Sequence, residues 1–146
     1  MHSWRDRTSQ EAQADLDALL NAALPFALQT LSRHSEFYPF AAEVTLEGDL
    51  GVLGPDGTGG QPQPGDVLHA LYTSARESSA SRRAVTFAAW VDVNGSDTIR
   101  IELEHREGMA LTLLVPYSRR RMRKSVTLGE ISAGPGERRV WPKQAP

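Results

Sequence analysis

The chain has 146 residues, of which 40% are hydrophobic, 23% are charged and none is cysteine. This composition suits one soluble domain, and the lack of cysteine excludes disulfides, thiolate zinc sites and cysteine nucleophiles. The net charge is −2, no apolar run reaches the roughly 20 residues that span a bilayer, and the N-terminus lacks the apolar core of a secretory signal, so we expect a cytoplasmic protein without membrane contact.

The first predicted element is an amphipathic helix over about residues 11–33. Thr8 and Glu11 have the spacing of a capping box, in which each side chain satisfies a free backbone donor at the helix start. Pro25 interrupts the pattern, so we expect a kink there or two abutting helices. The apolar side chains recur at spacings of three and four, which is the helical period: Leu16, Leu19, Leu20, Ala23, Leu24, Ala27 and Leu31.

Two strands and a second helix are predicted next. Apolar and polar residues alternate over 40–47, and a short strand over 50–53 returns after a turn at Gly48 and Asp49. Residues 54–65 are rich in glycine and proline, which predicts a surface loop. Asp66 is placed to cap the second helix, and the apolar face of that helix consists of Val67, Leu68, Leu71, Tyr72 and Ala75.

Three further strands are predicted over residues 85–93, 99–106 and 109–117, with turns at Asn94-Gly95 and Glu107-Gly108. A weaker strand signal lies around 126–131, before a tail rich in glycine and proline. The order α-β-β-α-β-β-β predicts a two-layer α+β domain, in which an antiparallel sheet of about five strands carries helices on one face. The seven residues expected to be nearly buried are Leu20, Leu24, Val44, Val85, Phe87, Ile101 and Leu113.

We place the single domain at residues 9–141 and expect flexible termini at 1–8 and 142–146. Its element order resembles that of roadblock and longin-type domains. The motif Glu-Phe-Tyr-Pro-Phe-Ala at 36–41, together with the hairpin sequence at 99–108, resembles a family of small uncharacterised bacterial proteins over residues 12–141. That resemblance implies a soluble bacterial protein, and it carries no activity or site residue.

Histidines are the first residues to consider for chemistry. His34 and Glu36 follow the first helix, and His105 ends a strand, so the three could line a cleft or hold a metal. None of them has the spacing of a known metal motif. We interpret His34 as a helix-end charge and His105 as a partly buried, hydrogen-bonded side chain, and we expect no catalytic, metal-binding or cofactor-binding residue and no cofactor.

Paired carboxylates are the second candidate. Glu102 and Glu104 lie two apart on one strand face, about 6–7 Å from each other, as an acid and base pair would. Arg100 and Arg106 flank them, which keeps both glutamates ionised. We interpret this face as solvated and charge-alternating, with cover by a partner as the alternative.

Charge is unevenly distributed along the chain. Residues 1–75 carry 3 basic and 10 acidic side chains, whereas residues 76–146 carry 13 basic and 8 acidic ones. The densest basic run consists of Arg119, Arg120, Arg121, Arg123 and Lys124 around Met122. Such a run can contact phosphates, but basic residues also protect strand edges, and we regard nucleic acid as an unlikely partner.

Trp90 indicates self-association. It shares a strand face with Ala84, Thr86 and Ala88, opposite Val85 and Phe87. If the helices cover only the valine and phenylalanine face, the tryptophan face is smooth, apolar and bare, and a second copy is its simplest cover. The alternative is intramolecular cover by the second helix or by Val140 and Trp141 from the tail. The expected partner is therefore a second copy in a homodimer, and the candidate interaction surface consists of Trp90, Arg119, Arg120, Arg121, Arg123 and Lys124.

Three functions remain open from the sequence. We favour a non-catalytic protein-interaction or self-associating domain. The first alternative is a small enzyme or ligand-binding domain with its site near His34, Glu36 and His105. The second alternative is a nucleic-acid-associated module that uses the basic run 119–124.

Overall fold

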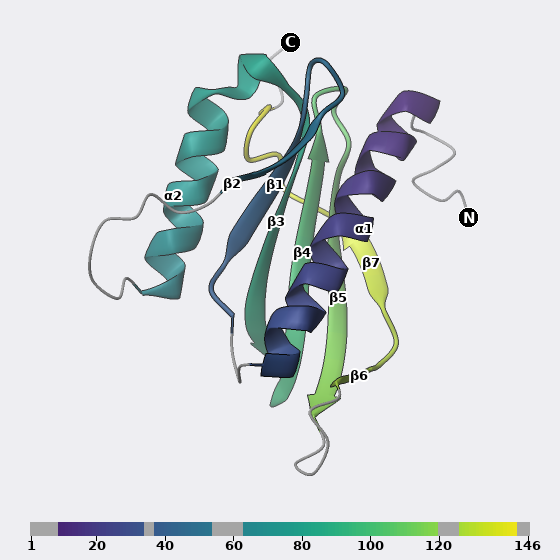
Figure 1. The fold of residues 1–146 in the computed structure, drawn as a ribbon, viewed down its shortest axis with the longest axis vertical. Coiled ribbons are helices and arrows are strands. Elements are labelled where there is room, and N and C mark those ends of the chain that lie inside the picture. The colour runs from purple at the N-terminus through teal and green to yellow at the C-terminus, as the bar shows by residue number, and fades with distance from the viewer. Residues whose placement is uncertain (1–8, 34–36, 54–62, 120–125, 143–146) are drawn as a thin grey trace.

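The computed structural model describes residues 9–33, 37–53, 63–119 and 126–142. Figure 1 shows helices packed against a curled sheet. The helices are α1 (Gln10–Arg33) and α2 (Pro64–Glu77), and a short 3-10 turn spans Ser79–Ser81. The strands are β1 (Phe40–Thr45), β2 (Leu50–Leu53), β3 (Arg82–Val93), β4 (Ser96–His105), β5 (Ala110–Arg119), β6 (Val126–Leu128) and β7 (Ser132–Pro135).

The sheet is antiparallel throughout and has the order β2-β1-β3-β4-β5-β6. β7 also pairs with β5, next to β6, so these two short strands share the outer edge of β5. The prediction of an α+β domain with an antiparallel sheet is confirmed. Among the described residues, the sheet has seven strands where about five were expected, because the weak signal near residue 126 corresponds to two short strands.

Tight hairpins set the register of the sheet. Asn94 and Gly95 both have positive φ, 52° and 85°, which is the type I′ geometry that the Asn-Gly pair favours between β3 and β4. Gly48 and Gly108 have φ of 93° and 109° and complete three-residue loops, in which a left-handed residue closes the turn. The predicted turns are therefore confirmed.

The main core lies between α1 and one face of the sheet. Side chains from β1, β3, β4 and β5 alternate toward this helix, so that every second residue of each strand is buried under it. Its fully buried large residues are Leu16, Leu19, Leu31, Ile99, Ile101 and Val115. α1 is the element that closes this face of the sheet.

A second, smaller core lies on the opposite face. There α2 and the C-terminal segment, residues 137–142, cover Ala41, Val85 and Phe87. The expectation that both helices lie on one face is therefore wrong. The reason is that β3 carries apolar side chains on both faces, and a central strand of this kind requires cover on both sides.

The buried positions agree with the predicted set at Val44, Val85, Phe87, Ile101 and Leu113. The two remaining predictions, Leu20 and Leu24, pack against the main core but stay partly exposed. The apolar face of α1 spans more than one row of side chains, and the row formed by Leu16, Leu19, Ala23, Ala27 and Leu31 faces the sheet most directly.

The helix ends differ from expectation in detail. α1 is a single helix through Pro25, which lies on its exposed side, so the expected division into two helices is not seen. Ser9 accepts a hydrogen bond from the Ala12 N–H at 3.1 Å and caps this helix, whereas Thr8 lies outside the described residues. α2 begins at Pro64, without a side-chain cap from Asp66.

The expected flexible termini, 1–8 and 142–146, lie outside the described residues except for Pro142. Most of the expected loop over 54–65 also lies outside them. In the described part of the chain, no helix combines the length and apolarity needed to cross a membrane.

Candidate functional site

His105 is a fully buried side chain at the end of β4. Its Nδ1 accepts a hydrogen bond from the backbone N–H of Glu107 at 3.1 Å, which places the ring proton on Nε2. Nε2 donates to Asp15 Oδ2 at 2.9 Å. Both ring nitrogens are therefore used inside the protein, and no solvent reaches the ring.

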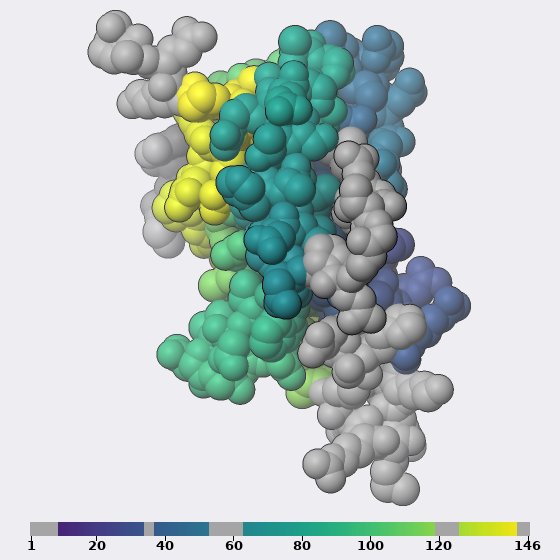
Figure 2. Space-filling model, turned by 90° about the vertical axis from the view of Figure 1, so that its left-hand side faces the viewer, coloured from purple at the N-terminus to yellow at the C-terminus, as the bar shows by residue number. Residues whose placement is uncertain are grey.

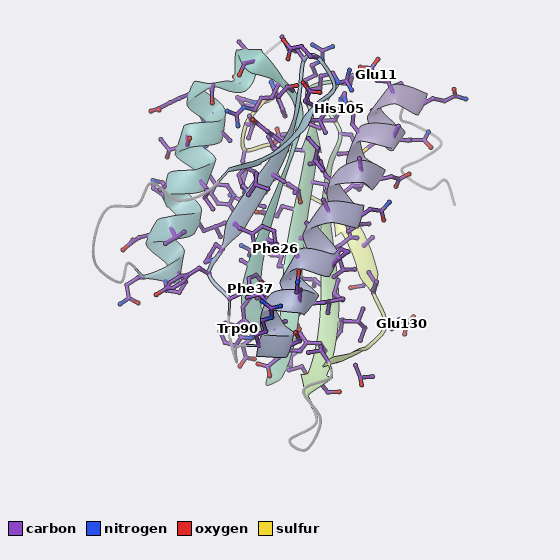
Figure 3. The ribbon with its side chains drawn as sticks, in the orientation of Figure 1. Glu11, Phe26, Phe37, Trp90, His105 and Glu130 are labelled. Carbon is purple, nitrogen blue, oxygen red and sulfur yellow. The ribbon has the colours of Figure 1, made fainter. Side chains whose placement is uncertain are left out.

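The same contacts fix the N-terminal part of α1 to the sheet. Asp15 Oδ1 accepts a second hydrogen bond, at 2.8 Å, from Arg83 on β3, and this bond raises the pKa of the Arg83 guanidinium. Ser9 Oγ donates to Glu107 Oε2 at 2.8 Å. Figure 3 shows His105 beside this end of the helix. We conclude that the histidine holds the helix in place.

Of the three residues of the predicted cleft, His34, Glu36 and His105, the structure describes only His105. His34 and Glu36 lie outside the described residues. Among the residues that the structure describes, no group of three histidine, aspartate or glutamate side chains is placed to hold a metal ion. His105 itself has no free ring nitrogen to offer a ligand.

Glu102 lies on the opposite face of β4, beneath α2. Its carboxylate accepts hydrogen bonds from the hydroxyl of Tyr72 and from Arg139 Nε, the latter at 2.8 Å. The Arg139 guanidinium also lies 4.3 Å from the centre of the Tyr72 ring. Burial and the bond to Glu102 raise the pKa of Tyr72 well above its ordinary value.

Glu104 binds the backbone of the C-terminal segment. Its two carboxylate oxygens accept the N–H groups of Arg139, Val140 and Trp141 at 2.8, 3.0 and 2.8 Å. Val140 is buried against the sheet beside them. A carboxylate that receives several N–H donors tolerates burial because its lone pairs are satisfied.

The interpretation of Glu102 and Glu104 as a solvated face is therefore wrong. They are 9% and 3% exposed, and the chain's own α2 and C-terminal segment cover them. The alternation of charges along β4 gave no sign of this cover, because Tyr72 of α2 lies 30 positions before Glu102 and Val140 lies 36 positions after Glu104. The carboxylates act as anchors for that segment.

Trp90 is 41% exposed, and its indole N–H donates to Asp97 Oδ1 at 3.0 Å. Its neighbours on the same strand face, Ala84, Thr86 and Ala88, are fully buried, because α1 lies over this face. The bare apolar sheet face expected around Trp90 is thus absent. Arg119 ends β5, and the rest of the basic run, 120–124, lies outside the described residues.

Two further aromatic side chains near the C-terminal part of α1 are half-exposed. Phe26 is 50% and Tyr38 is 51% exposed. Phe26 packs edge-on against Phe40 with ring centres 4.7 Å apart. Figure 3 shows Phe26 and Trp90 toward the same end of the molecule. Phe26 and Trp90 therefore already contact their own chain on one side.

Among the described residues, the largest exposure of apolar side chains is at the edge of the sheet. β2 is the first strand in the sheet order and pairs only with β1 among the described strands. Val52 is 75% and Leu50 is 52% exposed, and Leu46 in the preceding turn is 42% exposed. Figure 2 shows the blue β1–β2 hairpin at the margin of the molecule, next to the teal helix α2. We call the free side of Leu50–Leu53 the β2 edge.

Backbone groups of this edge point away from β1. The Thr45 N–H donates to the Asp49 carbonyl at 2.9 Å, so this pair is hydrogen-bonded. Such pairs alternate along an antiparallel ladder, and the next one joins Glu43 to Gly51. Leu50 and Val52 therefore turn their N–H and C=O groups outward, where no described strand receives them.

The side chains of Leu50 and Val52 lie on the face that α1 covers further in. They stand opposite Val44 and Ala42, both of which are buried in the main core. The hydrophobic face thus continues past α1 to the edge. β2 contains neither a charge nor a proline, the features that ordinarily protect an edge strand from pairing.

Comparison of the chain with models of protein families, with curated proteins and with solved structures finds no match. The resemblance of residues 36–41 and 99–108 to small bacterial proteins therefore stays a prediction.

Proposed function

We propose that the protein is a non-catalytic protein-interaction domain that binds an extended strand along the β2 edge. The observation that carries the proposal is that Leu50 and Val52 have both outward backbone groups and exposed apolar side chains. In strand addition, backbone hydrogen bonds supply affinity and alternate side chains supply specificity. The β2 edge offers both.

The opposite edge of the sheet is divided between two short strands. β6 and β7 pair separately along the outer side of β5, and β7 ends in Pro135, which cannot donate to a further strand. β2 is one continuous edge strand without a proline. This asymmetry favours β2 as the side that receives a partner.

The use of the buried ionisable groups supports a non-catalytic function. His105, Asp15, Glu102 and Glu104 all hold one element of the fold to another. A general acid or base must reach the proton that it transfers. These four groups reach only their own chain, so their chemistry is structural.

A photo-crosslinking amino acid at Val52 tests the proposal in cells that make the protein naturally. We expect a discrete adduct from position 52, and a much weaker one from Val93, a second exposed valine at the end of β3, whose exposure of 37% compares with 75% for Val52. Adding Leu50→Pro removes an outward N–H at the first residue of β2, a position where a strand tolerates proline, and should abolish the adduct. Equal adducts from both positions, or an adduct unaffected by Leu50→Pro, would refute strand addition.

A further inference from the structure

We infer that the strand received at the β2 edge is β2 of a second copy, which gives a two-fold dimer centred on Gly51. This inference rests on the proposed function and names the partner. The inferred dimer depends only on the residues of β2 and on the direction of their backbone N–H and C=O groups. It differs from self-association through the Trp90 face, which α1 covers.

The backbone geometry of β2 is complementary to itself. A two-fold axis perpendicular to the sheet at Gly51 places Leu50 opposite the partner's Val52, and Val52 opposite the partner's Leu50. Both of these residues direct their N–H and C=O groups outward. Each outward donor therefore meets an outward acceptor, which is the requirement for an antiparallel ladder.

The side chains also match in this register. Residues that stand opposite each other in an antiparallel pair point to the same face of the sheet. Leu50 and the partner's Val52 therefore meet on the face that carries the main core of each copy. On the other face the two copies of Gly51 have no side chain, so the strands can approach closely.

Other registers of the two β2 strands pair fewer of their outward N–H and C=O groups. A shift by one residue sets the outward residues opposite inward ones and breaks the ladder. A shift by two sets Val52 opposite Gly48 of the partner's turn, or moves Leu50 past the end of the partner's β2.

Charge agrees with the register centred on Gly51. β2 has no ionisable side chain, and Asp49, which precedes it, stands opposite the partner's uncharged Leu53. A register that set Asp49 against its own copy would oppose like charges, which destabilises a strand pair. No like charges meet in the inferred pairing.

A single cysteine at the centre tests the register. Opposite residues in a non-hydrogen-bonded pair have Cα atoms about 4.5 Å apart, which a disulfide can bridge. The chain has no cysteine, so Gly51→Cys can form only an intermolecular disulfide. A Cβ at Gly51 would lie 3.6 Å from its nearest neighbour, Glu43 Oε1, so the substitution fits.

The matched control is Gly134→Cys in β7, a strand glycine with open space around a Cβ. Under mild oxidation at low micromolar concentration, we expect Gly51→Cys to form covalent dimers at least about tenfold faster than the control, because pairing raises the effective thiol concentration. Equal rates of dimer formation would overturn the inference.

A charge exchange tests the same contacts without a covalent bond. The double variants Leu50→Lys/Val52→Lys and Leu50→Glu/Val52→Glu each oppose like charges across the two-fold axis. In sedimentation at micromolar concentration, the wild type should be dimeric, each variant alone monomeric, and their equimolar mixture dimeric again. Both positions are exposed, so circular dichroism should show each variant folded. A mixture that stays monomeric contradicts the inferred pairing.

Different results would refute the proposed function and the inferred dimer. If the crosslinker at Val52 captures a different protein while the purified wild type sediments as a monomer, the second copy is the wrong partner and the interaction function stands. If neither the crosslinker nor sedimentation finds any partner at the β2 edge, both proposals are wrong.

Discussion

Replacing Glu104 with glutamine should loosen the C-terminal segment from the sheet. The carboxylate accepts the backbone N–H groups of Arg139, Val140 and Trp141 and is 3% exposed. A glutamine keeps one acceptor oxygen and turns an NH₂ group toward at least one of these donors. That donor is then buried without a partner beside Val140.

The magnitude follows from the bonds that are lost. A hydrogen bond to a charged group contributes about 1.5–3 kcal/mol, and a buried donor without a partner costs about 1–3 kcal/mol. We expect Glu104→Gln to lower the free energy of unfolding by about 3 kcal/mol. For a domain of this size, the melting temperature should fall by about 10 °C.

Thermal unfolding and amide hydrogen exchange together check this prediction. Glu130→Gln is the matched control, because Glu130 is exposed between β6 and β7 and its replacement should change stability by less than about 0.5 kcal/mol. In the wild type, the amides of Arg139, Val140 and Trp141 should exchange slowly, and Glu104→Gln should speed their exchange. Unprotected amides in the wild type, or equal melting temperatures for the two variants, would refute the anchoring function of Glu104.

Four other substitutions test the packing and the buried network. In a denaturant titration, Leu16→Ala should lower the free energy of unfolding by about 3–5 kcal/mol. Leu20→Ala should lower it clearly less, because only Leu16 is fully buried. Equal losses would contradict the assignment of the helix face that packs on the sheet. Asp15→Ala should cost about 3–5 kcal/mol, since it leaves the donors of His105 and Arg83 unpaired. A loss below about 1 kcal/mol would contradict the conclusion that Asp15 fixes α1 to the sheet. The raised pKa of Tyr72 implies that the unfolded chain ionises first, so stability should fall as the pH rises above about 10, and Tyr72→Phe should remove this part of the decline.

Local signals in the sequence were sufficient for most of the elements. The leucine spacing of α1 and the alternation in β3, β4 and β5 predicted their type and approximate bounds. The Asn94-Gly95 pair predicted its turn. These features depend on residues close together in the chain, where backbone propensity and side-chain period decide the conformation.

Long-range contacts could not be predicted in the same way. The bond between His105 and Asp15 joins residues 90 positions apart, and the anchoring of Val140 by Glu104 joins residues 36 apart. From the sequence, the side chains of His105 and Glu104 could equally face water. Only the topology of the chain decides whether another element covers them. The apolar character of β3 on both faces was the one sign that cover was needed on both sides.

The β2 edge depends both on local sequence signals and on long-range strand pairing. The residues Leu-Gly-Val-Leu predicted a strand, and their lack of charge is visible in the sequence. Their position at the margin of the sheet follows from the pairing of β1 with β3, which the sequence pattern does not reveal. From the sequence, the candidate interaction surface is therefore predicted at Trp90 and the basic run, whereas the exposed side chains of Leu50 and Val52 support the proposal at β2.

The measurement that tests the β2 edge most directly is amide hydrogen exchange of Leu50, Gly51 and Val52 at increasing protein concentration. The Gly51 N–H already faces β1, so its exchange should not change. The outward N–H groups of Leu50 and Val52 should become protected as the second copy pairs with them. If these two amides exchange at the same fast rate at every concentration up to the high micromolar range, the edge receives no second copy.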